Sequence, residues 1–493
     1  MPIYRIRFNF ILAQAVVHIL FAGALTLFNL KGSHNFLGII AFWYVLSYIY
    51  IFYRELKTAP DFHPFLILLL SSVQFVGLNG LSSYVKLLDG QTFKFGIYSI
   101  NAIMASGIFY VSLQHLLLYT GYCLAERYTG RNEEETNDSD TIYQKVMYSD
   151  YPYFKTAIYA YCFVWIMRGV NLFIPLASLG SLANNIAASG HIIALYLLVF
   201  AKIQNPHKTA VMRLHWMIVI FEIALVLGMG MKELIISNLV PYTLLLLLQY
   251  HANVLQINKT LLLKLGILFF FVVNVFIYIS VFRDLANKKQ TEWANISVSD
   301  AFSGYADYIM GDGMYATDDK EEGKGLDYLL SRAGTIGCNA WSIDYAQTKS
   351  TKPDYLYYCS MGLIPRILWL NKPNLQTGGM MYRLATGHEG SWNRPIEKNI
   401  CSISIGFIGS CYFSLGFWGA MIIPLLMGIF INLYWMIIKR HIHDSIVALW
   451  AFMALVSLFL KDCESLQDCG MVFTAWSCAY MLIIKLVHSI SVK

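Results

Sequence analysis

Residues 261–282 read LLLKLGILFFFVVNVFIYISVF, a run of 22 residues whose single charged side chain is Lys264. A helix needs about 20 mainly apolar residues to cross the hydrocarbon core of a bilayer. The run therefore predicts a membrane-spanning helix, and similar segments recur along the whole chain. We predict about twelve spans, at residues 8–30, 36–53, 62–83, 97–123, 154–176, 186–201, 212–230, 234–251, 261–282, 418–438, 445–460 and 470–487.

The composition supports an all-α polytopic membrane protein. Of the 493 residues, 57% are hydrophobic and 13% are charged, and the mean hydropathy is +0.52. Soluble domains carry about 25% charged residues, so this chain has too few to cover a globule of its size. A soluble enzyme, a disordered chain and a coiled coil are excluded. The net charge of +6 is typical of basic cytoplasmic loops and does not indicate nucleic-acid binding.

The distribution of cations predicts the orientation of the chain in the membrane. Arg5 and Arg7 precede the first span, which favours a cytoplasmic N-terminus, and alternate loops counted from there hold most of the Lys and Arg residues. An even number of spans returns the C-terminus to the cytoplasm. We therefore divide the chain into a bundle of about nine helices (1–282) with an acidic cytoplasmic linker (126–150), a large outer loop (283–416), and about three further helices (417–493).

The outer loop is rich in Trp, Tyr, Ile and Leu, so we expect it to fold and to contain short helices. Residues 326–343 repeat apolar side chains at helical spacing. Arg332, Thr335 and Asn339 share the polar face of this helix. That helix is expected either to lie on the membrane surface or to turn this face, with Arg332, toward a cavity that holds an anion.

Two proline-bounded positive charges follow in the loop. Residues 362–374 read GLIPRILWLNKPN, in which Pro365 and Pro373 restrict the backbone around Arg366, Trp369 and Lys372. A guanidinium, an ammonium and an indole on a rigid turn suit a phosphate or pyrophosphate that carries a sugar. The alternative is that these long side chains snorkel at the membrane interface.

A glycine-rich stretch after this turn holds further polar candidates, Tyr382, Arg383, His388, Glu389 and Arg394. His388 or Glu389 could serve as a general base, although such a pair is also common on ordinary surfaces. Residues 402–416, SISIGFIGSCYFSLG, predict a short re-entrant element covered by protein or lining a cavity.

Ionisable residues inside the predicted spans require partners, because a charge in hydrocarbon is costly. Arg168 lies in the fifth span and Glu222 in the seventh. They are expected either to form a structural ion pair or, in the functional alternative, to leave Arg168 on a pyrophosphate. His18, His115 and His191 lie in apolar segments and are predicted to be hydrogen-bonded packing residues.

The order of these features resembles the Wzy-type oligosaccharide repeat-unit polymerases of bacterial surface polysaccharide (O-antigen, capsule or exopolysaccharide) assembly. The resemblance rests on Pro365-Arg366, Trp369, Lys372-Pro373 and the Gly/aromatic-rich stretch 404–419, and it covers residues 326–430. One departure is that Cys411-Tyr412 has no carboxylate where that family often places an acidic residue before the aromatic.

The resemblance implies a GT-C-like glycosyltransferase architecture in the bacterial cytoplasmic (inner) membrane. By resemblance, the substrate is an undecaprenyl-pyrophosphate-linked oligosaccharide, polymerised on the outer face without a metal or other cofactor, and a flippase and a chain-length regulator are expected partners. We expect Arg366, Arg332, Arg383, His388 and Glu389 to be catalytic. We expect Lys372, Trp369, Arg168, Tyr382 and Arg394 to bind the substrate. A lipid-linked glycan transporter (flippase) and an O-antigen ligase-type glycosyltransferase remain alternatives.

Overall fold

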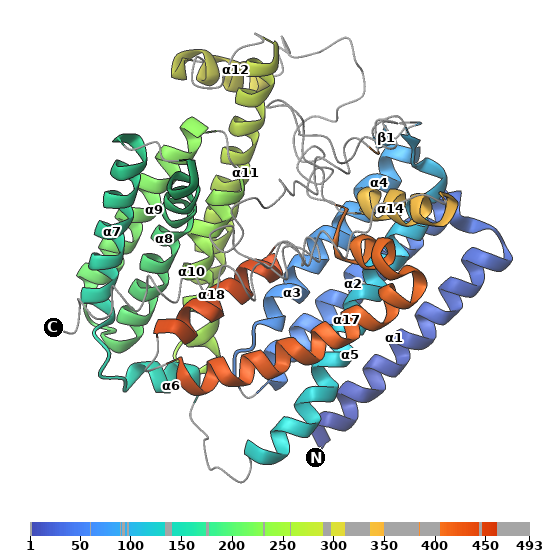
Figure 1. Cartoon of the computed structure of the whole chain (residues 1–493), viewed down its shortest axis with the longest axis horizontal. Helices are drawn as coiled ribbons and strands as arrows, with labels where there is room; N and C mark the ends of the chain where they lie inside the picture. Colours follow the sequence, from blue (N-terminus) through green and yellow to red (C-terminus); the bar gives the residue numbers. More distant parts are fainter. Residues whose placement is uncertain are drawn as a thin grey trace.

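The computed structural model of the chain is almost entirely helical (Figure 1). The only strands within the described residues are β1 (Lys94–Phe95) and β2 (Tyr98–Ser99), which pair antiparallel. The structure describes residues 2–59, 61–88, 90, 94–95, 98–133, 141–173, 177–229, 232–256, 258–288, 297–310, 336–349, 384, 405–442 and 446–460.

The first part of the chain forms a group of long helices on the right of Figure 1. The helix α2 begins after Ser33, whose hydroxyl accepts a hydrogen bond from the backbone N–H of Phe36 at 3.3 Å, the usual way to satisfy a helix N-terminus. The elements are α1 (Pro2–Leu27), η1 (Leu30–Gly32), α2 (His34–Thr58), α3 (Phe65–Ser72), the π-helical η2 (Val73–Leu78), α4 (Asn79–Leu88), η3 (Asn101–Ile103) and α5 (Met104–Glu133).

A second group of helices lies on the left of Figure 1 and is built mainly from α7, α8, α9 and α10. Two C-terminal helices, α17 and α18, join the two groups. The elements are α6 (Ile142–Met147), α7 (Tyr153–Phe173), α8 (Ala177–Gln204), α9 (Thr209–Met229), α10 (Lys232–His251), α11 (Lys259–Lys288), α12 (Val298–Met310), α14 (Ile336–Thr348), α17 (Phe407–His441) and α18 (Ile446–Leu460).

Five helical segments of the described residues are long and apolar enough to cross a membrane, which makes this a membrane protein. They are Asn9–Leu27, His34–Thr58, Phe65–Leu88, Asn101–Tyr128 and Phe407–His441. Helices also occupy every predicted span up to residue 460. The twelfth predicted span, 470–487, lies outside the described residues.

The helices α5 and α17 approach each other closely, and this approach depends on two glycines. A Cβ added to Gly121 would collide with the carbonyl oxygen of Leu425, and one added to Gly428 would collide with that of Leu118. Small residues let backbones approach closely where helices cannot rely on a hydrophobic drive for association. The two glycines thus explain why α17 lies so close to α5.

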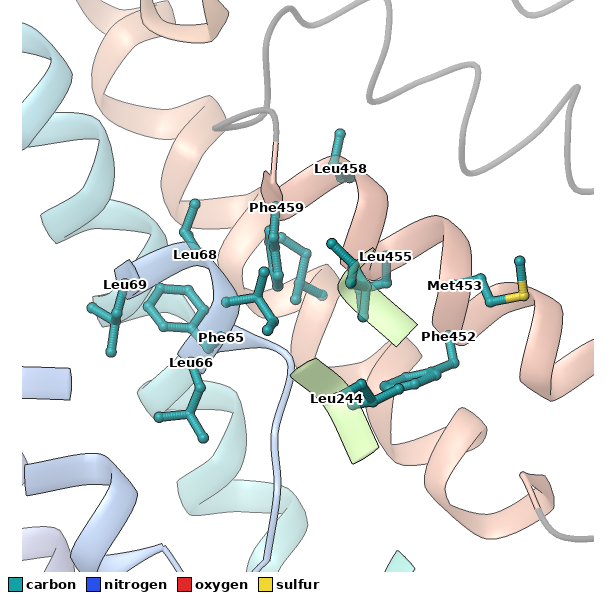
Figure 2. Close-up of a cluster of buried hydrophobic side chains, with 14 of the residues drawn as sticks. Phe65, Leu66, Leu68, Leu69, Leu244, Phe452, Met453, Leu455, Leu458 and Phe459 are labelled. Atoms are coloured by element: carbon teal, nitrogen blue, oxygen red, sulfur yellow. The ribbon is translucent and has the colours of Figure 1, made fainter. Parts of the chain in front are cut away.

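A buried apolar cluster connects the two helix groups. Figure 2 shows side chains of α3, α10 and α18 packed against one another, among them Phe65, Leu244 and Phe452. Phe65 and Phe459 meet edge to face at a centroid distance of 5.9 Å, a preferred geometry for aromatic pairs. The cluster places α18 between the two groups.

Loops that carry many of the cations meet at one end of the bundle, called here the basic end. The carboxylate of Asp61, between α2 and α3, accepts a hydrogen bond from the backbone N–H of Ile142 at 3.0 Å. It also lies 4.0 Å from the Nζ atom of Lys439, at the end of α17. Burial raises the pKa of Asp61 above its ordinary value, although Lys439 and the backbone N–H donors act to lower it. The loop between α2 and α3, the segment before α6 and the end of α17, all predicted to be cytoplasmic, therefore lie at the same end.

The predicted acidic linker, residues 126–150, is more ordered at both ends than expected. The helix α5 continues to Glu133, and α6 begins with a capping box between Thr141 and Gln144. Ile142 and Val146 of α6 are buried, and α6 packs on α8. The apolar face of α6 is therefore not solvated, whereas Arg127 and Tyr128 near the end of α5 are exposed. Residues 134–140 lie outside the described residues.

The opposite end, called here the loop end, holds part of the long loop. The helix α14 contacts β1 and η3, and η3 contacts η1. The helix α12 packs along α11, where the hydroxyl of Tyr305 donates to Oδ1 of Asn274 at 2.7 Å. The prediction that this loop contains short helices is confirmed for α12 and α14.

Candidate functional site

A crevice at the loop end lies between α1, α5, α14 and the start of the long part of α17. Its volume is about 540 Å³, which is within the range of small-molecule sites. Its walls are mostly apolar. Ile19 and Phe417 line it and are 69% and 51% exposed, so the crevice opens toward the side of the bundle. An apolar chain could enter there from a surrounding bilayer.

Polar groups gather where α14 forms the mouth of this crevice. Asp344 and Gln347 of α14 and Tyr110 of α5 all line it. The amide of Gln347 donates to the hydroxyl of Tyr412 at 2.9 Å, and the rings of Tyr110 and Tyr412 meet edge to face at 5.8 Å. A carboxylate, an amide and two phenols beside an apolar cavity suit a molecule with an apolar tail and a hydroxyl-rich head.

The N-terminus of α17 is held by amide side chains from two other helices. Oε1 of Gln114 on α5 accepts from the backbone N–H of Ile408 at 3.0 Å. Oδ1 of Asn339 on α14 accepts from the backbone N–H of Gly409 at 2.8 Å. The first N–H groups of a helix have no partner within it, so these bonds replace a local cap. They also fix α14, and with it the mouth of the crevice, to α17.

Of the small-residue stretch 402–416, the structure describes residues 405–416, and a helix begins at Phe407. That this element re-enters the membrane stays a prediction. Within α17 the backbone leaves helical geometry at Leu415 and at Gly416, where φ is +64°. Residues 407–414 therefore form a separate half-helix, in which Ser410, Cys411 and Phe413 are buried. Phe417 and Trp418, just after the break, are exposed and lie beside the crevice.

The sequence placed Asn339 on a polar helix face directed either at the membrane or at a cavity. Neither alternative describes it. Asn339 is 1% exposed and pairs with the start of α17, and Ile336 and Ile343, three and four residues away on the same side of the helix, are also buried. The helix α14 is packed between α5 and α17 because both of its faces have partners.

Arg168 and Glu222 form the structural ion pair that was one of the two predictions for them. The Nη1 and Nη2 atoms of Arg168 donate to Oε1 and Oε2 of Glu222 at 2.9 and 2.8 Å. The hydroxyl of Tyr161 donates to Oε1 of Glu222 at 3.0 Å, and Nδ1 of His191 lies 3.9 Å from Oε2. Glu222 is 1% exposed. A role of Arg168 on a pyrophosphate stays a prediction.

The other residues predicted to form the site lie outside the described residues. They are Arg332, Arg366, Trp369, Lys372, Tyr382, Arg383, His388, Glu389 and Arg394. The sequence analysis missed Asp344, Gln347, Tyr110 and the crevice itself. The spacing of Asp344 and Gln347 by three residues was an available signal, since it places them on one helix face. Within the described part of the chain, no group of three or more His, Cys, Asp or Glu side chains is arranged to hold a metal ion.

The long apolar helices, the buried intrahelical charges and the lateral crevice define a helical membrane protein. The chain belongs to the family described as Domain of unknown function (DUF8712), whose model matches residues 89–439. The matched range includes α5, the long loop and nearly all of α17. No curated protein and no solved structure matches the chain.

Proposed function

We propose that the protein is a glycosyltransferase that polymerises lipid-linked oligosaccharide repeats on the outer face of the bacterial cytoplasmic membrane. In this proposal about twelve helices cross the membrane, both termini are cytoplasmic and the loop end faces outward. The donor is an undecaprenyl-pyrophosphate-linked glycan, and the acceptor is the terminal sugar of a second lipid-linked repeat. The architecture would be GT-C-like.

The single observation that carries the proposal is that a helix of the long loop, α14, forms the mouth of the lateral crevice. The helix α14 belongs to the same loop as the candidate arginines, which supports the proposal that this loop and the cavity form one site. Arg332 precedes α14 by four residues in the sequence, and Arg366 follows it. Tail binding and headgroup binding are then assigned to neighbouring segments.

The distribution of charge supports assigning the lipid tail to the crevice and the pyrophosphate to the loop. Among the described residues that line the crevice there is no Lys or Arg, and Asp344 would repel a pyrophosphate. The leaving pyrophosphate therefore needs the cations of the loop, for which we propose Arg366, Arg332 and Arg383 with Lys372. Fixed guanidinium groups stabilise charge that develops on a leaving group. Asp344 instead suits a sugar hydroxyl of the acceptor.

The test is the length ladder of surface polysaccharide in cells that carry only a variant copy. Arg366→Ala should reduce the ladder to single repeats, and Arg366→Lys should restore it poorly because the bidentate fork is lost. Asp344→Asn should shorten the ladder. Arg213→Ala and Asp300→Asn serve as matched controls, because both residues are exposed and lie outside the crevice.

The ladder distinguishes the competing activities when wild type and variants are present in the membrane in equal amounts. A full ladder from Arg366→Ala contradicts the proposal. Loss of all glycan from the surface, single repeats included, favours a ligase or a transporter of the lipid-linked glycan.

A further inference from the structure

Buried hydroxyl and ionisable side chains follow one another through the interior of the first helix group, where α1, α2, α3 and α5 meet. We call this set the polar column. Every member is at most 7% exposed. The members are His18, Tyr44, Ser112, Tyr48, His115, Ser72, Tyr119, Glu55 and His63.

The column starts at the crevice, which His18 lines. Nδ1 of His18 lies 2.7 Å from the carbonyl oxygen of Gln14, so Nδ1 carries the proton and donates it there. Nε2 of the neutral ring is then an acceptor, and it lies 2.8 Å from the hydroxyl of Tyr44 and 3.3 Å from that of Ser112. His18 thus connects the crevice to α2 and α5.

In the middle of the column the hydrogen bonds run in one direction, from Tyr48 through His115 to Ser72. The hydroxyl of Ser72 donates to the carbonyl of Leu68 at 2.7 Å, so its oxygen accepts from Nε2 of His115 at 3.4 Å. Nδ1 of His115 is then free of a proton and accepts from the hydroxyl of Tyr48 at 3.0 Å. The rings of Tyr48 and Tyr44 stack with their centroids 5.8 Å apart, which places this part of the column beside the first part.

The column ends at the basic end of the bundle. The hydroxyl of Tyr119 donates to Oε1 of Glu55 at 2.8 Å. Oε2 of Glu55 lies 3.5 Å from Nε2 of His63, which is in the loop between α2 and α3. Further titratable groups of this end are Asp61 in the same loop, Lys439 of α17 and His251 of α10.

The three parts follow one another in order along one face of α5. Ser112, His115 and Tyr119 follow one another at intervals of three and four residues, so they lie on one face about one turn, or 5.4 Å, apart. The path proposed below therefore includes a bridging water molecule between one part of the column and the next. A π-helical segment, η2, directly follows Ser72, and such segments are frequent at functional sites.

These groups share a chemical property that packing alone does not require. A neutral imidazole, a phenol and an alcohol can each accept a proton on one side and release another on the opposite side. Chains of Asp, Glu and His inside membrane helices mark proton relays, whereas apolar side chains would fill the same space at no electrostatic cost.

We propose that the polar column conducts protons between the crevice and the basic end. In each step one N–H or O–H bond breaks and one forms at the next group. One proton enters at His18 and one leaves at His63, or the reverse, and no oxidation occurs. The transmembrane proton gradient and electric potential supply the driving force. This activity is independent of the glycosyl transfer proposed above.

The experiment uses the full chain in vesicles of phosphatidylethanolamine and phosphatidylglycerol that enclose a pH-sensitive dye. A potassium gradient with valinomycin sets the membrane potential, and the rate of internal pH change is recorded. The wild type should conduct faster than protein-free vesicles. His115→Leu should lose this excess, since it interrupts the middle of the column. Tyr48→Phe removes only one hydroxyl and should also lower the rate.

His215→Leu is the matched control, because His215 is equally buried but lies on α9, which packs on α8 and α10. It should conduct like the wild type. The measurement is repeated with extracted lipid-linked glycan in the vesicles. A wild type that conducts no faster than protein-free vesicles in both conditions overturns the proposal. Conduction by folded His115→Leu and Tyr48→Phe at the wild-type rate overturns it as well.

Discussion

Two regions of the molecule bury ionisable groups among apolar side chains but compensate these groups differently. The first region is formed by α7 and α9, and the second by α1 to α5. In the first region Arg168 and Glu222 neutralise each other through two short hydrogen bonds. In the second region His18 and His115 each accept a hydrogen bond from a tyrosine hydroxyl, so these imidazoles are satisfied by neutral groups.

The difference separates two uses of buried polarity. A bidentate ion pair is closed, because each charge is satisfied by the other and neither is available for exchange. In the second region each imidazole both accepts and donates a hydrogen bond, so the bond from a tyrosine hydroxyl continues through His18 to the carbonyl of Gln14 and through His115 to Ser72. The first arrangement holds helices together, and the second offers a path. If stability follows this distinction, breaking the ion pair should lower the unfolding free energy more than removing one hydroxyl of the column.

The largest effect is expected when the ion pair is broken on one side. Arg168→Leu leaves the carboxylate of Glu222 buried without its counter-charge, which should cost about 3–5 kcal/mol of unfolding free energy. The measurement is thermal unfolding in detergent micelles, read as the temperature at which the protein leaves its monodisperse peak in size-exclusion chromatography.

The double variant Arg168→Leu/Glu222→Leu provides the sharpest check on this prediction. Removing both charges should recover most of the loss, because an apolar pair of similar volume often replaces a buried ion pair without penalty. Arg213→Leu, on the exposed surface of α9, is the control. Equal unfolding temperatures for the single and the double variant would contradict the assignment of a compensated pair.

A smaller effect is expected inside the polar column. Tyr48→Phe removes the hydroxyl that faces Nδ1 of His115 and leaves that nitrogen buried without its donor. An unsatisfied buried acceptor costs about 1–3 kcal/mol, less than an isolated charge. The same unfolding assay measures it. A loss as large as that of Arg168→Leu would mean that the column also carries a charge essential for folding.

The smallest effect is expected for Ser112→Ala. The hydroxyl of Ser112 donates to the carbonyls of Ile108 and Phe109 in its own helix, and Nε2 of His18 retains Tyr44 as a partner. Because no buried group is left without a hydrogen bond, the change should stay below about 1 kcal/mol. An unfolding temperature that falls as far as in Tyr48→Phe would indicate that Ser112, and not Tyr44, is the principal partner of His18.

Much of the fold could be predicted from hydropathy, because crossing a bilayer imposes a length and a composition on each segment. The helix α18 begins one residue away from its predicted span, and the break before Trp418 followed from the run of small residues. The partner of Arg168 was also predictable, since a charge in an apolar helix must be compensated. Helix ends were less predictable, because α5 extends past the apolar run to Glu133.

The site was less accessible to sequence reasoning for a physical reason. Its contacts join residues far apart in the chain, such as Asn339 with Gly409 and Gln114 with Ile408. No local pattern encodes a pairing of this kind. Asp344 was overlooked because a single carboxylate in an outer loop is ordinary until the helix that carries it is placed against a cavity. The candidate arginines stay predictions.

The interruption of α17 at Leu415 and Gly416 has a mechanical consequence. The half-helix 407–414 is hydrogen-bonded to α5 and α14 through two side-chain amides. The longer part of α17, residues 417–441, packs closely on α5 at Gly428. Apart from its chain neighbours and the backbone of its own helix, no atom of the described residues lies within 4 Å of a Cβ built at Gly416, so a side chain there would meet open space. Both pieces are therefore held against α5, and the break between them lets the chain change direction without loosening either contact.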